Sequence, residues 1–179
     1  MKRLLPSLVL TFGLIACSTE EPTGEVQYTP GAPASASYIA SDATEAEIVG
    51  IVQRLFDALE HGDADLLREV LDPDVVMKWS EARDGMTTFG STDVEGLAAR
   101  ITSSADPLIE RMWSPTVFVD GPLATVWTPY DFYAGAEFSH CGVDTVSLIE
   151  YEDGWRIVGL AWTRAQPPEC ELHPDGPPA

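Results

Sequence analysis

The stretch 124-ATVWTPYDFYAGAEFSHCGVDTVSLIEYEDGWRIVGLAWT-163 decides the fold of this chain. Its residues at 124–133, 137–151 and 155–163 are rich in Val, Ile, Thr, Tyr, Phe and Trp, and only Ala134-Gly135 and Glu152-Asp153-Gly154 separate these runs. Such runs are typical of strands. Because parallel strands need a long crossover, connections this short predict antiparallel neighbours.

One more β-rich run lies just upstream, at 109–119, and ends at Asp120-Gly121-Pro122. It extends the meander to four strands in a row. Further upstream, the run at 75–79 is also expected to form a strand, and the polar segment 83–89 is expected to be a loop.

Helical patterns come before the meander. Thr44-x-x-Glu47 has the form of a capping box, and apolar residues follow it at helical spacing to about Glu60. A short helix is expected at 64–71, and Thr92-x-x-Glu95 opens a third. Helices followed by a meander predict the α+β class, and 179 residues are enough for one domain with a core.

The first residues predict export. Lys2 and Arg3 precede a short apolar run, 4–15, which is well below the roughly 20 residues that a membrane span needs. The run closes with Leu14-Ile15-Ala16-Cys17. A signal cut at an ordinary small-residue site and a single membrane helix are the alternatives.

The Leu14–Cys17 sequence resembles the lipobox of bacterial lipoproteins. The resemblance implies a signal peptide over 1–16, cleavage before Cys17, and acylation of that cysteine with fatty acids such as palmitate. The segment 17–42, rich in Ser, Thr, Ala, Gly and Pro, is then a flexible tether. The mature protein is expected to be lipid-anchored, facing the periplasm or the cell surface.

The charge balance is strongly acidic. With 10 Lys+Arg against 29 Asp+Glu the chain carries −19, so nucleic acid and anionic lipid surfaces should repel it. No phosphate-binding or dinucleotide-binding glycine motif occurs, and no cofactor is expected. No metal site is expected either, because His61, His140 and His173 lack paired zinc-type spacing.

Several segments resemble the nuclear transport factor 2 and SnoaL superfamily, and its branch named "putative lumazine-binding" in particular. They are the helical opening at 55–64, Leu71-Asp72-Pro73-Asp74-Val75, the run at 124–133, Phe138-Ser139-His140-Cys141-Gly142-Val143-Asp144, and Asp153-Gly154-Trp155-Arg156-Ile157. The resemblance implies a domain over 43–170. It also implies a cone-shaped roll, in which about three helices cover the concave side of a strongly curved, mostly antiparallel sheet and leave a cavity.

His140 and Asp144 are the main candidate catalytic residues. Side-chain direction repeats every two residues along a strand, so both could point into the cavity. A histidine and a carboxylate in an apolar pocket suit acid–base chemistry on a small molecule. The alternatives are a buried polar pair that only fixes sheet geometry, or exposure to solvent.

Asp131 is a weaker candidate base, with Tyr130 and Tyr133 nearby as phenol donors. Strand alternation, however, puts Asp131 and Tyr130 on opposite faces. The five tryptophans are expected mainly to pack the core and the sheet. Trp113 and Trp127, together with the two tyrosines, are the residues chosen as cavity lining and ligand contacts.

Cys141 and Cys170 are the thiols that remain once Cys17 is acylated. Export favours disulfides, and the last strand should lie beside the one that carries Cys141, so the two can form a bridge, although two cysteines do not prove one. The residues at 171–179 are expected to form a loose tail.

The leading functional hypothesis is a membrane-anchored domain that binds a small apolar or aromatic molecule without demonstrable catalysis. One alternative is an isomerase, cyclase or dehydratase of the SnoaL type that uses His140 with Asp144. The other is an interaction module that forms a homodimer through its outer sheet face.

Overall fold

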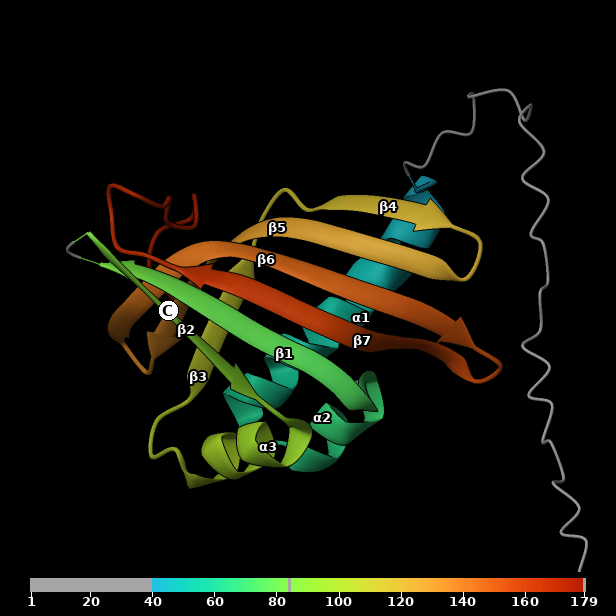
Figure 1. The fold of residues 1–179 in the computed structure, drawn as a ribbon, viewed down its shortest axis with the longest axis horizontal. Coiled ribbons are helices and arrows are strands. Elements are labelled where there is room, and N and C mark those ends of the chain that lie inside the picture. Colours follow the sequence, from blue (N-terminus) through green and yellow to red (C-terminus); the bar gives the residue numbers. More distant parts are fainter. Residues whose placement is uncertain (1–39, 84, 179) are drawn as a thin grey trace, which may run out of the picture. The chain divides into compact units, whose positions relative to one another are not determined.

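The computed structural model describes residues 40–83 and 85–178. The expected signal peptide and Cys17 lie outside the described residues. No helix in the described part is long and apolar enough to cross a membrane. The elements, shown in Figure 1, are α1 (Asp42–His61), α2 (Ala64–Val70), β1 (Leu71–Arg83), β2 (Met86–Thr92), α3 (Val94–Ser103), β3 (Leu108–Met112), β4 (Thr116–Asp120), β5 (Leu123–Ala134), β6 (Glu137–Tyr151) and β7 (Gly154–Arg164).

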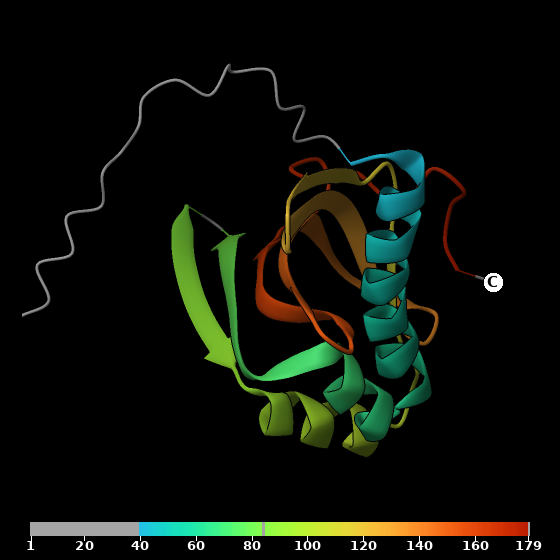
Figure 2. The ribbon, with the colours of Figure 1, turned by 90° about the vertical axis from the view of Figure 1, so that its right-hand side faces the viewer.

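The strands form a seven-stranded sheet in the order β2-β1-β7-β6-β5-β3, and β4 also pairs with β5. All neighbours are antiparallel except β1 and β7. The sheet curls strongly, and α1 runs along its concave side with α2 and α3 beside it at one end (Figure 2). The α+β class that the sequence pattern predicts is confirmed, and so is the helix-covered, curved sheet that the family resemblance implies.

Helix α1 supplies much of the core beneath the sheet. Its buried side chains repeat at helical spacing, as in Ile48, Val52 and Leu55. The helix starts slightly earlier than the capping-box pattern predicts: Ser41 is the N-cap, and its hydroxyl accepts the Thr44 N–H. The N-cap of helix α3 is one residue later than the pattern predicts. It is Asp93, not Thr92, because the Asp93 carboxylate accepts the Gly96 N–H at 2.7 Å.

The expected loop at 83–89 is wrong, because most of it belongs to strand β2, which pairs with β1. Most side chains of β2 are exposed, so it has no apolar alternation that the sequence could reveal. Gly90 of β2 lies opposite Trp79 of β1, and a Cβ at Gly90 would collide with the Trp79 indole. The absent side chain thus leaves room for that ring.

The expected single strand at 109–119 is two strands. Ser114 has φ 47°, a left-handed conformation that breaks the strand, and Thr128 Oγ1 donates to the Trp113 carbonyl at 3.1 Å. As a result β3 pairs with the second half of β5 and β4 with the first half. The break sends β3 toward α1, where it forms one wall of the interior (Figure 1).

The C-terminal segment is attached to the domain. A disulfide joins Cys141 to Cys170 with 5.8 Å between their Cα atoms. The backbone N–H of His173 donates to Asp131 at 3.0 Å, and the His173 ring packs edge-on against Trp113. The part of the expected loose tail that the structure describes, 171–178, therefore begins with residues that are held against the sheet.

Candidate functional site

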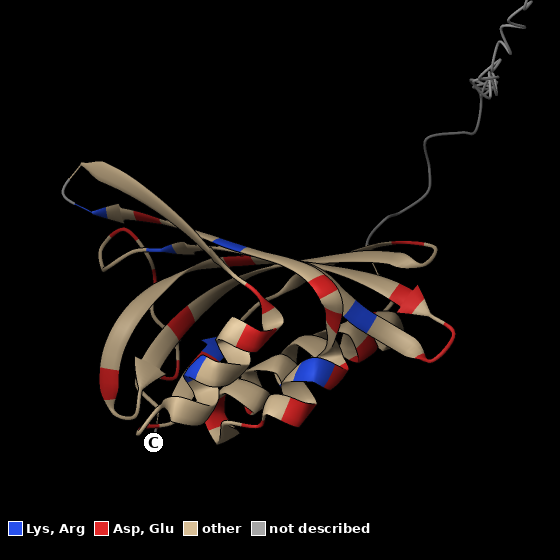
Figure 3. Cartoon of the chain, turned by 60° about the horizontal axis from the view of Figure 1, so that its bottom comes forward, with Lys and Arg blue, Asp and Glu red and all other residues tan. Residues whose placement is uncertain are grey.

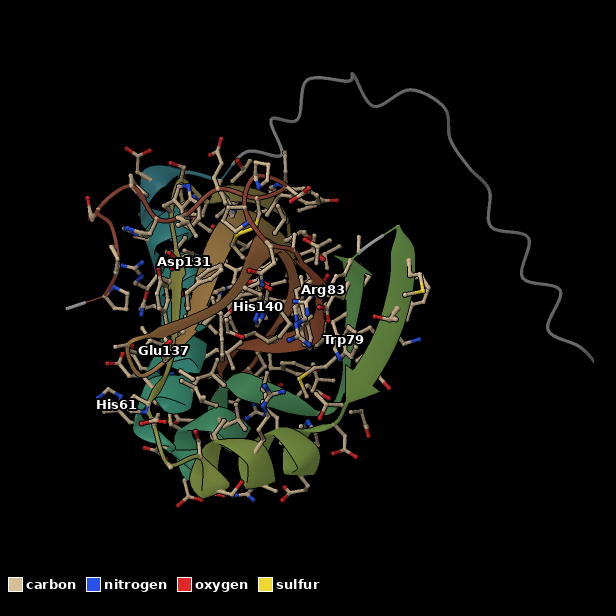
Figure 4. All side chains as sticks on the ribbon, turned by 90° about the vertical axis from the view of Figure 1, so that its left-hand side faces the viewer. His61, Trp79, Arg83, Asp131, Glu137 and His140 are labelled. Carbon is tan, nitrogen blue, oxygen red and sulfur yellow. A yellow bond between two sulfur atoms is a disulfide. The ribbon has the colours of Figure 1, made fainter. Side chains whose placement is uncertain are left out.

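A cavity lies between the concave face of the sheet and the helices. It is small, with a volume of about 80 Å³, which is room for several waters, and it is partly open to solvent. In Figure 4 His140 lies in this interior, with Trp79 on the β1 side of it. The lining residues are Leu55, Phe56, Leu59, Trp79, Leu97, Arg100, Leu108, Glu110, Tyr130, Phe132, His140, Asp144, Leu160, Trp162 and Arg164.

Strand alternation explains why these polar groups share one face. Glu110 is directly opposite Phe132 in the β3–β5 pair, and Phe132 is opposite His140 in the β5–β6 pair. Residues in register point to the same side of a sheet. Asp144, four residues beyond His140, keeps that direction, as the sequence predicts.

Two acidic side chains, Glu110 and Asp144, meet in the cavity wall. Both side chains line the cavity, and they are near enough for each to influence the pKa of the other. Asp144 is 1% exposed, and burial raises its pKa to about 7. Burial and the Asp144 charge raise the pKa of Glu110 well above its ordinary value. The pair therefore shares a proton at neutral pH, since two like charges this close resist joint ionisation.

The imidazole of His140 has other partners. Its Nδ1 lies 2.9 Å from the Ser139 hydroxyl, and its ring stacks on Phe132 with 4.9 Å between centroids. Burial, and then the charges of Arg164 and Arg100, lower the pKa of His140 to about 3. The ring is therefore neutral at physiological pH. The structure brings His140 and Asp144 to one cavity but pairs each with a different neighbour, and their catalytic role stays a prediction.

Tyr130 lines the cavity, but its hydroxyl donates to the Thr163 carbonyl at 2.7 Å. Burial is the main cause that raises its pKa, followed by the charges of Glu110 and Asp144. The phenol proton is thus committed to the backbone. This position fits a wall residue better than an oxyanion donor.

Asp131 lies on the opposite face of β5, away from the cavity. Arg111 donates two hydrogen bonds to the Asp131 carboxylate, from Nε at 3.0 Å and from Nη2 at 2.7 Å. The backbone N–H of His173 donates to the same carboxylate. Tyr133 packs beside this pair, with the Arg111 guanidinium 5.4 Å from its ring centre. The structure therefore does not form the base-plus-phenol arrangement considered for Asp131.

The two tryptophans chosen from the sequence lie outside the cavity. Trp127 is 52% exposed on the outer face of the sheet, and Trp113 sits in the break between β3 and β4. Strand alternation explains why Trp127 lies outside: Trp127 and Tyr130 have opposite parity along β5, and Tyr130 faces the cavity. Trp79 and Trp162 line the cavity instead, from paired positions on β1 and β7.

Sequence reasoning missed Glu110 and Arg164. Glu110 has the same parity along β3 as Leu108 and Met112, so the available signal was a charged residue on the face that carries apolar side chains. Arg164 follows Leu160 and Trp162 at the same parity on β7. Its guanidinium lies 5.3 Å from the Trp79 ring centre.

Among the residues that the structure describes, no group of three or more His, Cys, Asp or Glu side chains could hold a metal ion. The cavity's polar lining consists of carboxyl, guanidinium, imidazole and phenol groups from separate strands and α3.

Comparisons with known proteins place this geometry in a family. The sequence model described as "Putative lumazine-binding" matches residues 43–163. No protein of curated function matches the chain. Solved structures share its fold at low identity, which shows the fold alone.

A nuclear transport factor 2-like protein of unknown function from Silicibacter pomeroyi is 18% identical, with TM-score 0.51, over 71% of this chain and 100% of that one. A Kribbella flavida protein is 18% identical, with TM-score 0.56, over 71% and 94%. A nuclear transport factor 2-like protein with a cystatin-like fold from Novosphingobium aromaticivorans is 19% identical, with TM-score 0.56, over 69% and 82%. The chain belongs to the "Putative lumazine-binding" family.

Proposed function

We propose that this chain is an exported lipoprotein whose domain binds a small, flat organic molecule in the cavity. The observation that carries the proposal is a mostly apolar cavity with a buried carboxylate, Asp144, in its wall. Ligand sites combine an apolar lining with a few polar groups that fix orientation. Burying a carboxylate has a cost in free energy, so a buried carboxylate that borders a cavity indicates a role in binding.

The family description supports a small-molecule ligand and makes lumazine a natural first compound to test. The aromatic lining favours a flat molecule, because Trp162, Phe132 and His140 present rings to the same space. The cavity is small and partly open to solvent, so a flat compound of one or two rings would fill it and remain partly exposed at its mouth.

A thermal-shift screen of flat heterocycles, lumazine included, tests binding. Ligands that bind the folded state should raise the melting temperature, and raise it further as the ligand concentration increases. Leu97→Trp fills the cavity from α3 and should abolish the shift, whereas Leu123→Trp, on the exposed end of β5, should preserve it. Equal shifts in both variants would mean that the compounds bind elsewhere.

Anchoring is proposed from Leu14–Cys17 alone. When the wild-type chain is expressed in a bacterium with labelled palmitate, it should carry the label. The Cys17→Ser variant, expressed in the same way, should be found in the soluble fraction. An unlabelled wild-type chain would remove the anchor from the proposal.

Self-association is a second candidate, favoured by a charge-poor outer face. Phe89 is 77% exposed and Trp127 52%, and they line a shallow groove there in which Lys78 is the one charged lining residue. Acidic residues lie mainly on the helices and near the strand ends (Figure 3). Because the chain carries −19, two copies would repel least at this face.

Light scattering across a concentration series tests this candidate. A wild-type dimer that becomes a monomer in Trp127→Glu supports it. A monomer at every wild-type concentration contradicts it.

A further inference from the structure

Two buried side-chain polar atoms in the described residues lack a hydrogen-bond partner: Asp144 Oδ2 and Arg164 Nε. Both residues line the same cavity. Buried polar groups are nearly always bonded, and leaving one without a partner is costly. An unpaired acceptor and an unpaired donor in one cavity wall therefore point to a ligand that supplies the complements.

The Glu110 carboxyl cannot meet the whole need of Asp144. It has at most one proton to donate, and a carboxylate has two oxygens that each accept. At least one Asp144 oxygen is left for another donor. A protonated Glu110 that donates to Asp144 would hold the Asp144 carboxyl in place, and in the inference below Glu110 has this positioning role.

Asp144 and Arg164 are diagonal neighbours on adjacent strands. Asp144 is in register with Trp162, and Arg164 follows two residues later on the same face. The Arg164 guanidinium is further placed by Trp79 beneath it and by Glu81, whose Oε2 lies 3.7 Å from Nη1. The Asp144 acceptor and the Arg164 donor therefore lie on either side of Trp162, and each is held by its own neighbours.

The charges in the wall favour a neutral ligand. The Glu110–Asp144 pair resists an anion, while Arg164 and Arg100 resist a cation. A neutral ligand that meets both unpaired groups needs its own N–H and its own oxygen acceptor. The aromatic lining adds that the molecule is flat.

We propose that the cavity binds a neutral planar ring that carries a cyclic amide, a lactam or ureide, which donates its N–H to Asp144 and accepts from Arg164 through its carbonyl oxygen. This rests on the proposed binding function and adds which residues read the ligand. A hydrogen bond between a neutral ligand group and a charged side chain can change the affinity by about tenfold or more.

Calorimetry with three matched compounds at pH 8 tests the inference: quinolin-2(1H)-one, its N-methyl derivative and naphthalene. The lactam should bind the wild-type protein at least about tenfold more tightly than the other two. Asp144→Leu should bring the three affinities within about twofold, and Arg164→Lys, which keeps the charge, should also lower the preference. Thr145→Val, on the other face of β6, is the matched control.

Glu110 is tested by rescue. Glu110→Leu should reduce the preference for the lactam, and Glu110→Gln, which can still donate to Asp144, should restore it. A merely structural role would not distinguish lactam from naphthalene.

The outcomes separate the two proposals. If naphthalene and the lactam bind equally and Asp144→Leu changes neither, the cavity binds ligands but the unpaired atoms are satisfied by water, and the inference is overturned. If none of the three binds and the heterocycle screen also gives no shift, both proposals fall.

Discussion

The carboxyl of Glu110 on β3 meets the carboxyl of Asp144 on β6 across β5, in the wall of a mostly apolar cavity. Neither residue is near the other in sequence, and the curved sheet brings them together. The pair gives the cavity a shared proton, a property that measurements of stability against pH can detect.

Asp144→Asn should become stabilising as pH rises. The folded-state pKa of Asp144 is about 7 and its ordinary value is 3.8, so the folded state keeps a proton that the unfolded state releases. The wild-type protein therefore loses stability between about pH 4 and 7, by an amount on the order of 1–3 kcal/mol. The uncharged Asn variant lacks this loss.

Urea unfolding at pH 4.5 and pH 8 measures the difference between the two proteins. Glu137→Gln, at an exposed carboxylate outside the cavity, is the matched control. A wild-type-to-Asn difference that is the same at both pH values would contradict the shared proton.

His140→Gln should have the opposite pH dependence. The folded-state pKa of His140 is about 3, below its ordinary 6.5, so the unfolded state takes up a proton that the folded state refuses. The wild-type protein should lose at least about 2 kcal/mol relative to the variant as pH falls from 7 to 4. Unfolding curves of both proteins across that range measure it, and parallel curves would mean that His140 titrates normally.

The strength of each sequence signal explains how much of this architecture was predictable. The β-rich runs and short turns of 124–163 predicted the antiparallel meander, and the apolar spacing of 48–59 predicted α1. Strand β2 was missed because its side chains face solvent, so only backbone pairing with β1 defines it. No pattern of apolar residues records such a strand.

Parity along a strand placed His140 and Asp144 in the cavity, since both lie on the uninterrupted middle of β6. It could not place Glu110 beside Asp144, because that contact depends on the break at Ser114 and on the curvature of three strands. Contacts across a curved sheet are set by tertiary structure, which a local pattern does not contain.

Asp131→Asn should destabilise the protein without changing ligand binding. Asp131 is fully buried, and the change leaves Arg111 without its counter-charge and weakens the bond from His173. Breaking a buried ion pair from one side costs about 3–5 kcal/mol. Because Arg111 is partly exposed, the lower end of that range is expected.

Chemical unfolding and the ligand assay together check this expectation. Arg54→Ala removes an ion pair with Glu69 that is exposed on both sides, and should cost less than about 1 kcal/mol. A loss of ligand binding in a folded Asp131→Asn protein would instead return Asp131 to the list of site residues.

Gly90→Ala should cost about 1–3 kcal/mol, because the added Cβ enters space that the Trp79 ring occupies. The matched control is Gly50→Ala in α1, where a Cβ meets nothing within 4 Å and the better helix former should stabilise by about 0.5–1 kcal/mol. A double-mutant cycle identifies the cause. In a Trp79→Leu background the cost of Gly90→Ala should fall to nearly zero, because the colliding ring is gone. An undiminished cost in that background would place the strain in the β2 backbone, and Gly90 would then have no part in shaping the cavity wall.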